Sequence, residues 1–303
     1  MKKTIIYFWI VLISIMLVRV PLISIPFFNV DEGSSVVIGN TVLNGGIMYR
    51  DATDGRGPVT YFLYAAISFL SGKNNMTAVH AGLACLIILE AFVLYLISGL
   101  IYGKKSILWT AVCLGLFSYT PGFRDKLAFH GEWASIVFTS LGGYFFLKYI
   151  FKNKYLFLFI SGLSFGLAFF AKQLSMLDYA ATLLFCSGFV YLTKKDTSVL
   201  AKSLLSSFLG FLTVALVFVC YFYANHALSD FIFYFWGYYS HYYVPALSIM
   251  ERIRIAGSGY VPAFTGFFAL LIFFVNYRMT DSHKNKTREL FIDLYVLSWF
   301  IFS

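Results

Sequence analysis

Long apolar segments follow one another along almost the whole of this 303-residue chain. Most of them approach the roughly 20 residues that a helix needs to cross the hydrocarbon layer of a membrane. The composition agrees, because 60% of the residues are hydrophobic and only 12% are charged, too few to cover a soluble globule with polar surface. The sequence therefore predicts a polytopic membrane protein, and it excludes a soluble enzyme, a disordered chain and a disulfide-stabilised secreted module.

We expect an all-α fold with about nine transmembrane helices in a single domain over residues 1–303. The predicted spans are 5–28, 77–102, 106–120, 133–150, 155–171, 174–192, 204–223, 262–277 and 290–303. The apolar stretch 59–70 is too short to cross a membrane, so it is predicted to be an interfacial or re-entrant helix.

The positive charges predict the orientation of the chain. With the N-terminus in the cytoplasm, fourteen of the 23 Lys and Arg residues fall in inner segments and eight in outer ones. This assignment predicts a cytoplasmic (inner) membrane protein with two long loops, 29–75 and 225–261, on the outer face. The net charge of +9 then reflects a basic cytoplasmic rim, and nucleic acid is not expected as a partner.

The first outer loop begins with a pair of acids, Asp31 and Glu32, ahead of a predicted helix over 36–43. Two interpretations of this pair stay open, and they are compatible. The acids cap or favour the positive end of the helix, or they act in general-base catalysis. Pro58 then begins the second short helix, at the first-turn position where proline is tolerated.

Further charged residues fall in the same outer segments. Asp51 and Asp54 are expected to form turns through their side chains, and Arg56 has Asp54 as its simplest partner. Glu132 lies at the start of the fourth span. It is either a first-turn acid of that helix or a third carboxylate that faces the same outer pocket as Asp31 and Glu32. Lys172 sits at a tight corner between two spans, as a snorkelling lysine or as a ligand for an anionic headgroup.

The second outer loop is dominated by aromatic residues over 231–243, followed by Arg252 and Arg254. An interfacial aromatic belt is the simpler interpretation. The alternative is an aromatic wall beside a sugar or isoprenoid chain, with the arginines on its phosphate. Glu90 lies in the middle of a predicted span. A proton-coupled transporter would need an ionisable residue at such a depth, so a transporter or flippase of lipid-linked sugars stays open as an alternative function.

Several stretches resemble the GT-C type of integral-membrane glycosyltransferases, in the branch of the protein mannosyltransferases and the lipid A aminoarabinose transferase (glycosyltransferase family 39-like). The matching residues are Arg19 with Asp31-Glu32-Gly33, the "L-x-G-x-x-x-Y-R-D" stretch at 43–51, the "D-x-K-x-P-x-x-Y" stretch at 54–61, Glu132, and "G-x-x-x-G-x-x-x-x-x-K-Q" at 162–173.

The resemblance implies a GT-C-like fold and transfer of a hexose or pentose from a polyprenyl-phosphate donor to an acceptor hydroxyl at the outer face, with inversion. It implies Asp31 as the carboxylate general base with Glu32 as its partner. The residues it implies for substrate binding are Asp54, Arg56, Tyr61, Glu132, Lys172, Arg252 and Arg254. No cofactor is required, although a divalent metal is compatible. The acceptor is a lipid, a glycan or a protein.

Two departures from the family pattern affect these expectations. Gly57 stands where the family usually has proline. The chain also ends at Ser303, partway through an apolar segment, whereas family members usually continue with further spans. We therefore expect C-terminal spans to be missing, and a non-catalytic remnant that binds a lipid-linked sugar remains an alternative.

Overall fold

The computed structural model describes residues 2–26, 28–101 and 127–238. Within them the regular elements are helical, and an isolated bridge between Met48 and Ala52 is the single β feature. The elements are α1 (Lys2–Ile23), α2 (Val30–Leu43), α3 (Pro58–Ser71), α4 (Met76–Ile101), α7 (Gly131–Lys152), α8 (Tyr155–Ala171), the 3-10 turn η1 (Gln173–Ser175), α9 (Met176–Lys194), α10 (Thr197–Ala224), α11 (Leu228–Ile232) and the π-helical turn η2 (Phe233–Gly237).

Four helical segments in the described part are long and apolar enough to cross a membrane. They are Met76–Ile101, Gly131–Lys152, Gln173–Lys194 and Thr197–Ala224. The all-helical prediction is confirmed, but the count of about nine spans is not reached within the described residues. The 22-residue α1 is outside this set, and α8 is apolar but has only 17 residues. The predicted spans 106–120, 262–277 and 290–303 lie outside the described residues.

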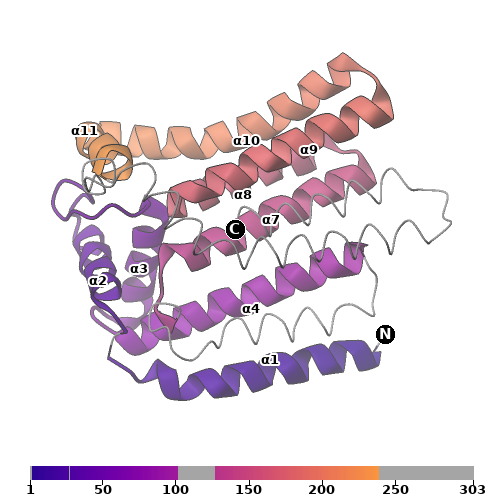
Figure 1. The fold of residues 1–303 in the computed structure, drawn as a ribbon. Coiled ribbons are helices and arrows are strands. Elements are labelled where there is room, and N and C mark those ends of the chain that lie inside the picture. The colour runs from indigo at the N-terminus through magenta and orange to yellow at the C-terminus, as the bar shows by residue number, and fades with distance from the viewer. Residues whose placement is uncertain (1, 27, 102–126, 239–303) are drawn as a thin grey trace, which may run out of the picture.

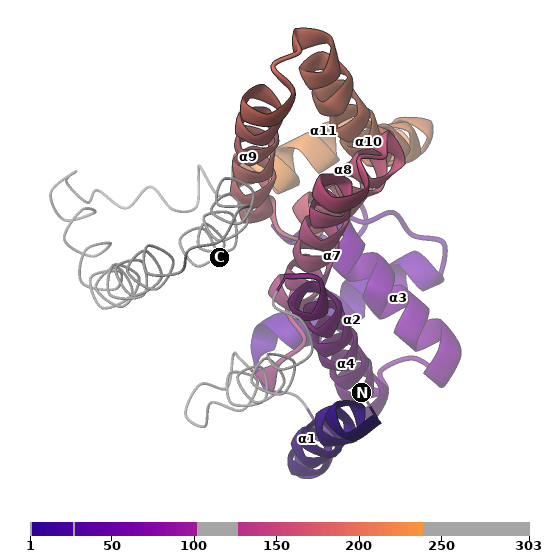
Figure 2. The same cartoon turned by 90° about the vertical axis from the view of Figure 1, so that its right-hand side faces the viewer.

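The long helices run side by side, with α2, α3 and α11 gathered at one end of them (Figure 1). Viewed along their axes, α1, α4, α7, α8 and α10 follow one another in a row, and α9 lies beside that row (Figure 2). We call the end that carries α2, α3 and α11 the loop end. Short turns at Asn153 and Lys195, both in the left-handed region, reverse the chain at the opposite end.

Glycines let α8 and α10 approach closely. A Cβ atom on Gly162 would lie 1.9 Å from the carbonyl oxygen of Ser207, and one on Gly210 would lie 2.0 Å from that of Phe159. Gly166 similarly faces Val214. The G-x-x-x-G spacing of Gly162 and Gly166 is typical of tight helix packing, and α8 packs on α10 in this way.

An aromatic core joins the two long loops at the loop end. Tyr49 is buried with its backbone in the left-handed region, and its ring centroid lies 5.5 Å from that of Phe222 and 5.7 Å from that of Phe231. Beside it, Arg50 donates a hydrogen bond from Nη1 to the carbonyl oxygen of Asn225. The charged residues of the first loop are therefore held on a packed base rather than on a free loop.

Candidate active site

Asp31 lies in the first turn of α2, but it does not cap that helix. The N-cap is Asn29, whose side-chain oxygen accepts a hydrogen bond from the backbone N–H of Glu32 at 2.9 Å. The side chain of Asp31 is 61% exposed, and its carboxylate is directed to Arg56. The capping interpretation therefore applies to Asn29, while Asp31 keeps an accessible carboxylate near the positive end of a helix.

Arg56 connects two carboxylates. Its Nη2 lies 2.6 Å from Oδ2 of Asp31, and its Nη1 lies 2.8 Å from Oδ2 of Asp54. Only 13% of the Arg56 side chain is exposed. Its backbone is also fixed, because Tyr49 donates its hydroxyl to the Arg56 carbonyl oxygen and the Arg56 N–H donates to the hydroxyl of Tyr61. The guanidinium thus holds Asp31 and Asp54 in a planar fork.

Glu32, unlike the exposed Asp31 beside it, is fully buried. Its carboxylate accepts hydrogen bonds from His80 Nε2 at 3.1 Å and from the backbone N–H groups of Phe129 at 2.8 Å and Phe28 at 3.1 Å. Burial alone raises the pKa of this carboxyl, but the bonds from His80, Phe129 and Phe28 together lower that pKa below its usual value. Glu32 is therefore a satisfied, ionised group inside the protein.

The corner after α8 carries the second charged pair. Nζ of Lys172 lies 2.7 Å from Oε1 of Glu132, and the two side chains are 29% and 51% exposed. Next to Lys172, Gln173 donates a hydrogen bond from Nε2 to the carbonyl oxygen of Gly55 at 3.4 Å. The corner therefore contacts the segment that carries Arg56.

Gly57 explains one departure from the family pattern. A Cβ atom at this position would lie 2.1 Å from the carbonyl oxygen of Phe170, at the end of α8. No larger residue fits without moving the corner. The chain uses glycine here because the loop before α3 rests directly on the backbone that leads to Lys172.

The remaining predicted residues divide into two groups. Asp51 forms a turn, because its side chain accepts a hydrogen bond from the backbone N–H of Ile47, and it makes an exposed ion pair with Arg50. The hydrogen bonds from Arg50 and Ile47 hold the pKa of its carboxyl below the usual value. Arg252 and Arg254 lie outside the described residues.

Among the residues that the structure describes, no group of three or more His, Cys, Asp or Glu side chains is placed to hold a metal ion.

A family comparison agrees with this arrangement. The model of the dolichyl-phosphate-mannose-protein mannosyltransferases matches residues 55–226, more than half of the chain. The chain belongs to this mannosyltransferase family. It is a multi-pass membrane glycosyltransferase of a family that uses a lipid-phosphate mannose donor. No curated protein and no solved structure matches the chain.

The mannosyltransferase match includes Arg56, Tyr61, Glu132 and Lys172, and it begins just after Asp54. Two further polar residues at the loop end, His80 and His130, were not predicted from the sequence. His80 lies in the first turns of the apolar helix α4 and His130 directly precedes α7, and the partner of each comes from a distant part of the chain. Of this cluster, the sequence had singled out Glu32, the acid that follows Asp31, which contacts His80.

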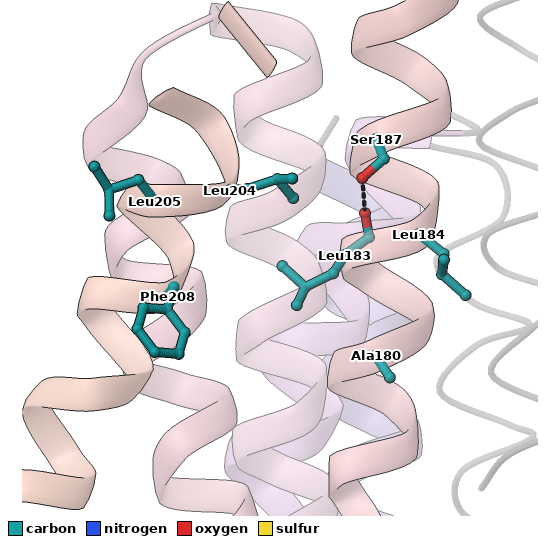
Figure 3. Close-up of a pocket in the computed structure, with 7 residues that line it drawn as sticks. All are labelled: Ala180, Leu183, Leu184, Ser187, Leu204, Leu205 and Phe208. Carbon is teal, nitrogen blue, oxygen red and sulfur yellow. Dashed lines mark hydrogen bonds between the residues drawn. The ribbon is translucent and has the colours of Figure 1, made fainter. Parts of the chain in front are cut away.

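Two other features of this mannosyltransferase lie along the long helices. Glu90 is buried in α4 and accepts a hydrogen bond from Ser140 at 2.7 Å. An apolar groove of about 660 Å³ lies between α9 and α10 (Figure 3). The residues that line it are Ala180, Leu183, Leu184, Ser187, Leu204, Leu205 and Phe208.

Proposed function

We propose that this protein transfers mannose from a polyprenyl-phosphate donor to an acceptor hydroxyl, with Asp31 as the general base. The observation that supports it best is the Asp31 carboxylate itself. It is 61% exposed and therefore reachable by a substrate, yet its position is fixed by Arg56 at 2.6 Å. Accessibility combined with a fixed position is what a base needs to accept a proton in a displacement reaction.

The proposed reaction is a single displacement. The acceptor oxygen forms a bond to the anomeric carbon while Asp31 takes its proton. The bond between that carbon and the phosphate oxygen breaks, and its electron pair leaves with polyprenyl phosphate. Because attack and departure occur on opposite sides of the sugar, the anomeric configuration inverts.

Lys172 is the cation that we assign to the donor phosphate. Arg56 already has a carboxylate on each of two nitrogens, whereas Lys172 pairs with the half-exposed carboxylate of Glu132. A cation beside the leaving phosphate stabilises the charge that develops there. Arg56 instead orients Asp31, and Asp54 and Tyr61 hold Arg56 in place.

The groove between α9 and α10 is the route that we propose for the isoprenoid chain of the donor. α9 begins at the Lys172 corner, and the groove residues on it lie between Ala180 and Ser187, from one turn past its start to about 16 Å along the helix. Figure 3 shows Leu183 directed towards α10 across this groove. An isoprenoid chain whose phosphate is bound at Lys172 can therefore lie along an apolar surface that runs away from this corner.

We place the reaction at the outer face of the cytoplasmic membrane in a GT-C-like fold with about nine spans. The charge split of fourteen inner and eight outer basic residues supports this orientation. The location of the first loop and of the described part of the second, residues 225–238, at one end of the helices is consistent with it (Figure 1). Sugar reaching that face must arrive already activated on a lipid.

The test is a transfer assay with the purified chain in lipid nanodiscs. Polyprenyl-phosphate mannose labelled in the sugar is supplied with a panel of lipid, glycan and peptide hydroxyl acceptors, and release of polyprenyl phosphate is followed together with product. We expect coupled release and transfer with inversion. Movement of intact donor across liposome membranes, without cleavage of its sugar–phosphate bond, would instead indicate a transporter.

A further inference from the structure

The buried contacts around Glu32 join three segments that are distant in the sequence. Glu32 belongs to α2, His80 to the start of α4, and Phe129 lies just before α7. All three are at most 4% exposed. The loop end of the molecule therefore has one polar junction at which α2, α4 and α7 are fixed to one another.

A second contact ties the same segments. Asn29, the N-cap of α2, lies with its Nδ2 2.9 Å from Nε2 of His130, the residue that precedes α7. His80 also reaches the end of α1, because its Nδ1 lies 3.3 Å from the carbonyl oxygen of Ile23. Both nitrogens of His80 therefore face oxygen atoms, one of Glu32 and one of Ile23.

From this arrangement we infer that Glu32, His80, Asn29 and His130 form a positioning unit, which sets the place of the Asp31 carboxylate relative to Lys172. The inference rests on the proposed function of Asp31. None of the four residues is a catalytic residue in this account, because each acts through the helix ends that it joins.

Two short links connect the buried junction around Glu32 to Asp31 and to Lys172. Asp31 and Glu32 are neighbours in the first turn of α2, about 100° apart around its axis, so fixing Glu32 inside fixes Asp31 outside. Phe129, which donates to Glu32, is three residues before Glu132, and Glu132 contacts Lys172 at 2.7 Å. A shift at the junction therefore changes the separation between the base and the phosphate cation.

Steady-state kinetics of Glu32→Gln test the inference. Gln is close in shape, but it presents an amide to the groups that donate to Glu32. We expect kcat to fall about 10- to 100-fold, since displacement of a reacting group by about 1 Å is enough for such a loss. The donor KM should change by less than about threefold. His80→Asn serves as a second variant should Glu32→Gln not accumulate, and Glu90→Gln is the matched control for a buried carboxyl elsewhere.

A double variant separates positioning from direct chemistry. In the background of Asp31→Asn, Glu32→Gln should cause no further loss of single-turnover rate, because the residue through which it acts is already disabled. A further tenfold loss, as large as in the wild-type background, would show that Glu32 acts on the reaction by itself and would overturn the inference.

A distance measurement needs no activity. With the native cysteines replaced by alanine, spin labels at Val30, which is 82% exposed, and Leu174, which is 65% exposed, report the separation of the α2 start from the Lys172 corner. We expect a narrow distance distribution in the parent and a shifted or broader one in Glu32→Gln, with no change in Glu90→Gln. An unchanged distribution in Glu32→Gln would overturn the positioning unit, whereas absent transfer by the parent protein would overturn only the proposed function.

Discussion

Asp31 Oδ2 and Arg56 Nη2 lie 2.6 Å apart, and this ion pair connects the first turn of α2 to the loop before α3. The two residues are separated by 25 positions in the chain, yet the same guanidinium also holds Asp54. In this pair the Asp31 side chain is 61% exposed, whereas the Arg56 side chain is only 13% exposed. An accessible carboxylate is thus oriented by a largely buried cation.

Substitution of Arg56 distinguishes orientation of Asp31 from binding of the donor phosphate. Arg56→Lys keeps the positive charge but cannot hold two carboxylates in a planar fork. We expect kcat to fall about tenfold with little change in the donor KM, because a poorly placed base slows the chemical step. Steady-state kinetics with varied donor check this. Near wild-type kcat in Arg56→Lys, with a raised donor KM in Arg56→Ala, would assign Arg56 to the phosphate.

Because Lys172 and Glu132 form an ion pair, substitutions of the two residues should have opposite effects on donor affinity. Lys172→Ala should weaken donor binding by about 1.5–3 kcal/mol, the value of a hydrogen bond to a charged group. Glu132→Gln removes the carboxylate that competes for Lys172, so donor affinity should rise, by at most about fivefold for a partly exposed pair. Equilibrium binding of the donor in nanodiscs measures both.

The control for this pair is Lys154→Ala, an exposed lysine at the start of α8 and so at the far end of that helix. It should leave donor affinity unchanged. Equal losses in Lys172→Ala and Lys154→Ala would indicate a general effect of charge, and unchanged affinity in Lys172→Ala would leave snorkelling as the explanation for that lysine.

The groove between α9 and α10 predicts dependence on lipid length. Leu183→Trp places a bulky ring in the groove and should weaken binding of a long-chain donor by about 1–2 kcal/mol, the value of one or two buried methylene groups. A short-chain donor that does not reach the groove should bind as before. Leu216→Trp, on α10 but outside the groove lining, is the matched control. An equal loss for both chain lengths would remove the groove from the donor path.

The orientation of the chain is tested by cysteine labelling in intact cells. Val30 is exposed at the loop end, and Lys195 lies in the turn at the opposite end. We expect an impermeant thiol reagent added outside to label Val30→Cys but not Lys195→Cys, and permeabilised cells to label both. Labelling of position 195 alone in intact cells would reverse the assignment of the outer face.

Local structure at the loop end followed closely from the sequence. Pro58 starts α3 as expected from its fixed backbone angle, and the helix predicted over 36–43 ends at Leu43 as expected, although it begins earlier, at Val30. The close helix packing at Gly162 also agrees with its G-x-x-x-G spacing, although that spacing does not name the partner helix. In each case residues within a few positions of one another decide the structure, so a linear reading is sufficient.

The partners of the charged residues were harder to predict, because they come from distant segments. Glu32 contacts His80, 48 positions away, and this contact exists only once α2 and α4 have packed. The resemblance implied Arg56 in substrate binding, and the sequence also predicted Asp54 as its partner. The pair with Asp54 is present, but the added contact with Asp31 depends on how two loops fold over the end of α8. The capping role that was kept open for Asp31 belongs to Asn29, because both residue types suit that position, and Asp31 lies in the first turn of the helix.

The most direct test of the account is the transfer rate of Asp31→Asn. Asn cannot accept the proton of the attacking hydroxyl, and the cap of α2 is Asn29, so the fold should be retained. We predict a loss of about 10²- to 10⁴-fold in mannose transfer from the lipid-phosphate donor, with donor affinity and thermal stability close to wild type. Transfer by Asp31→Asn at a rate near that of the wild-type protein would contradict the assignment of Asp31 as the general base.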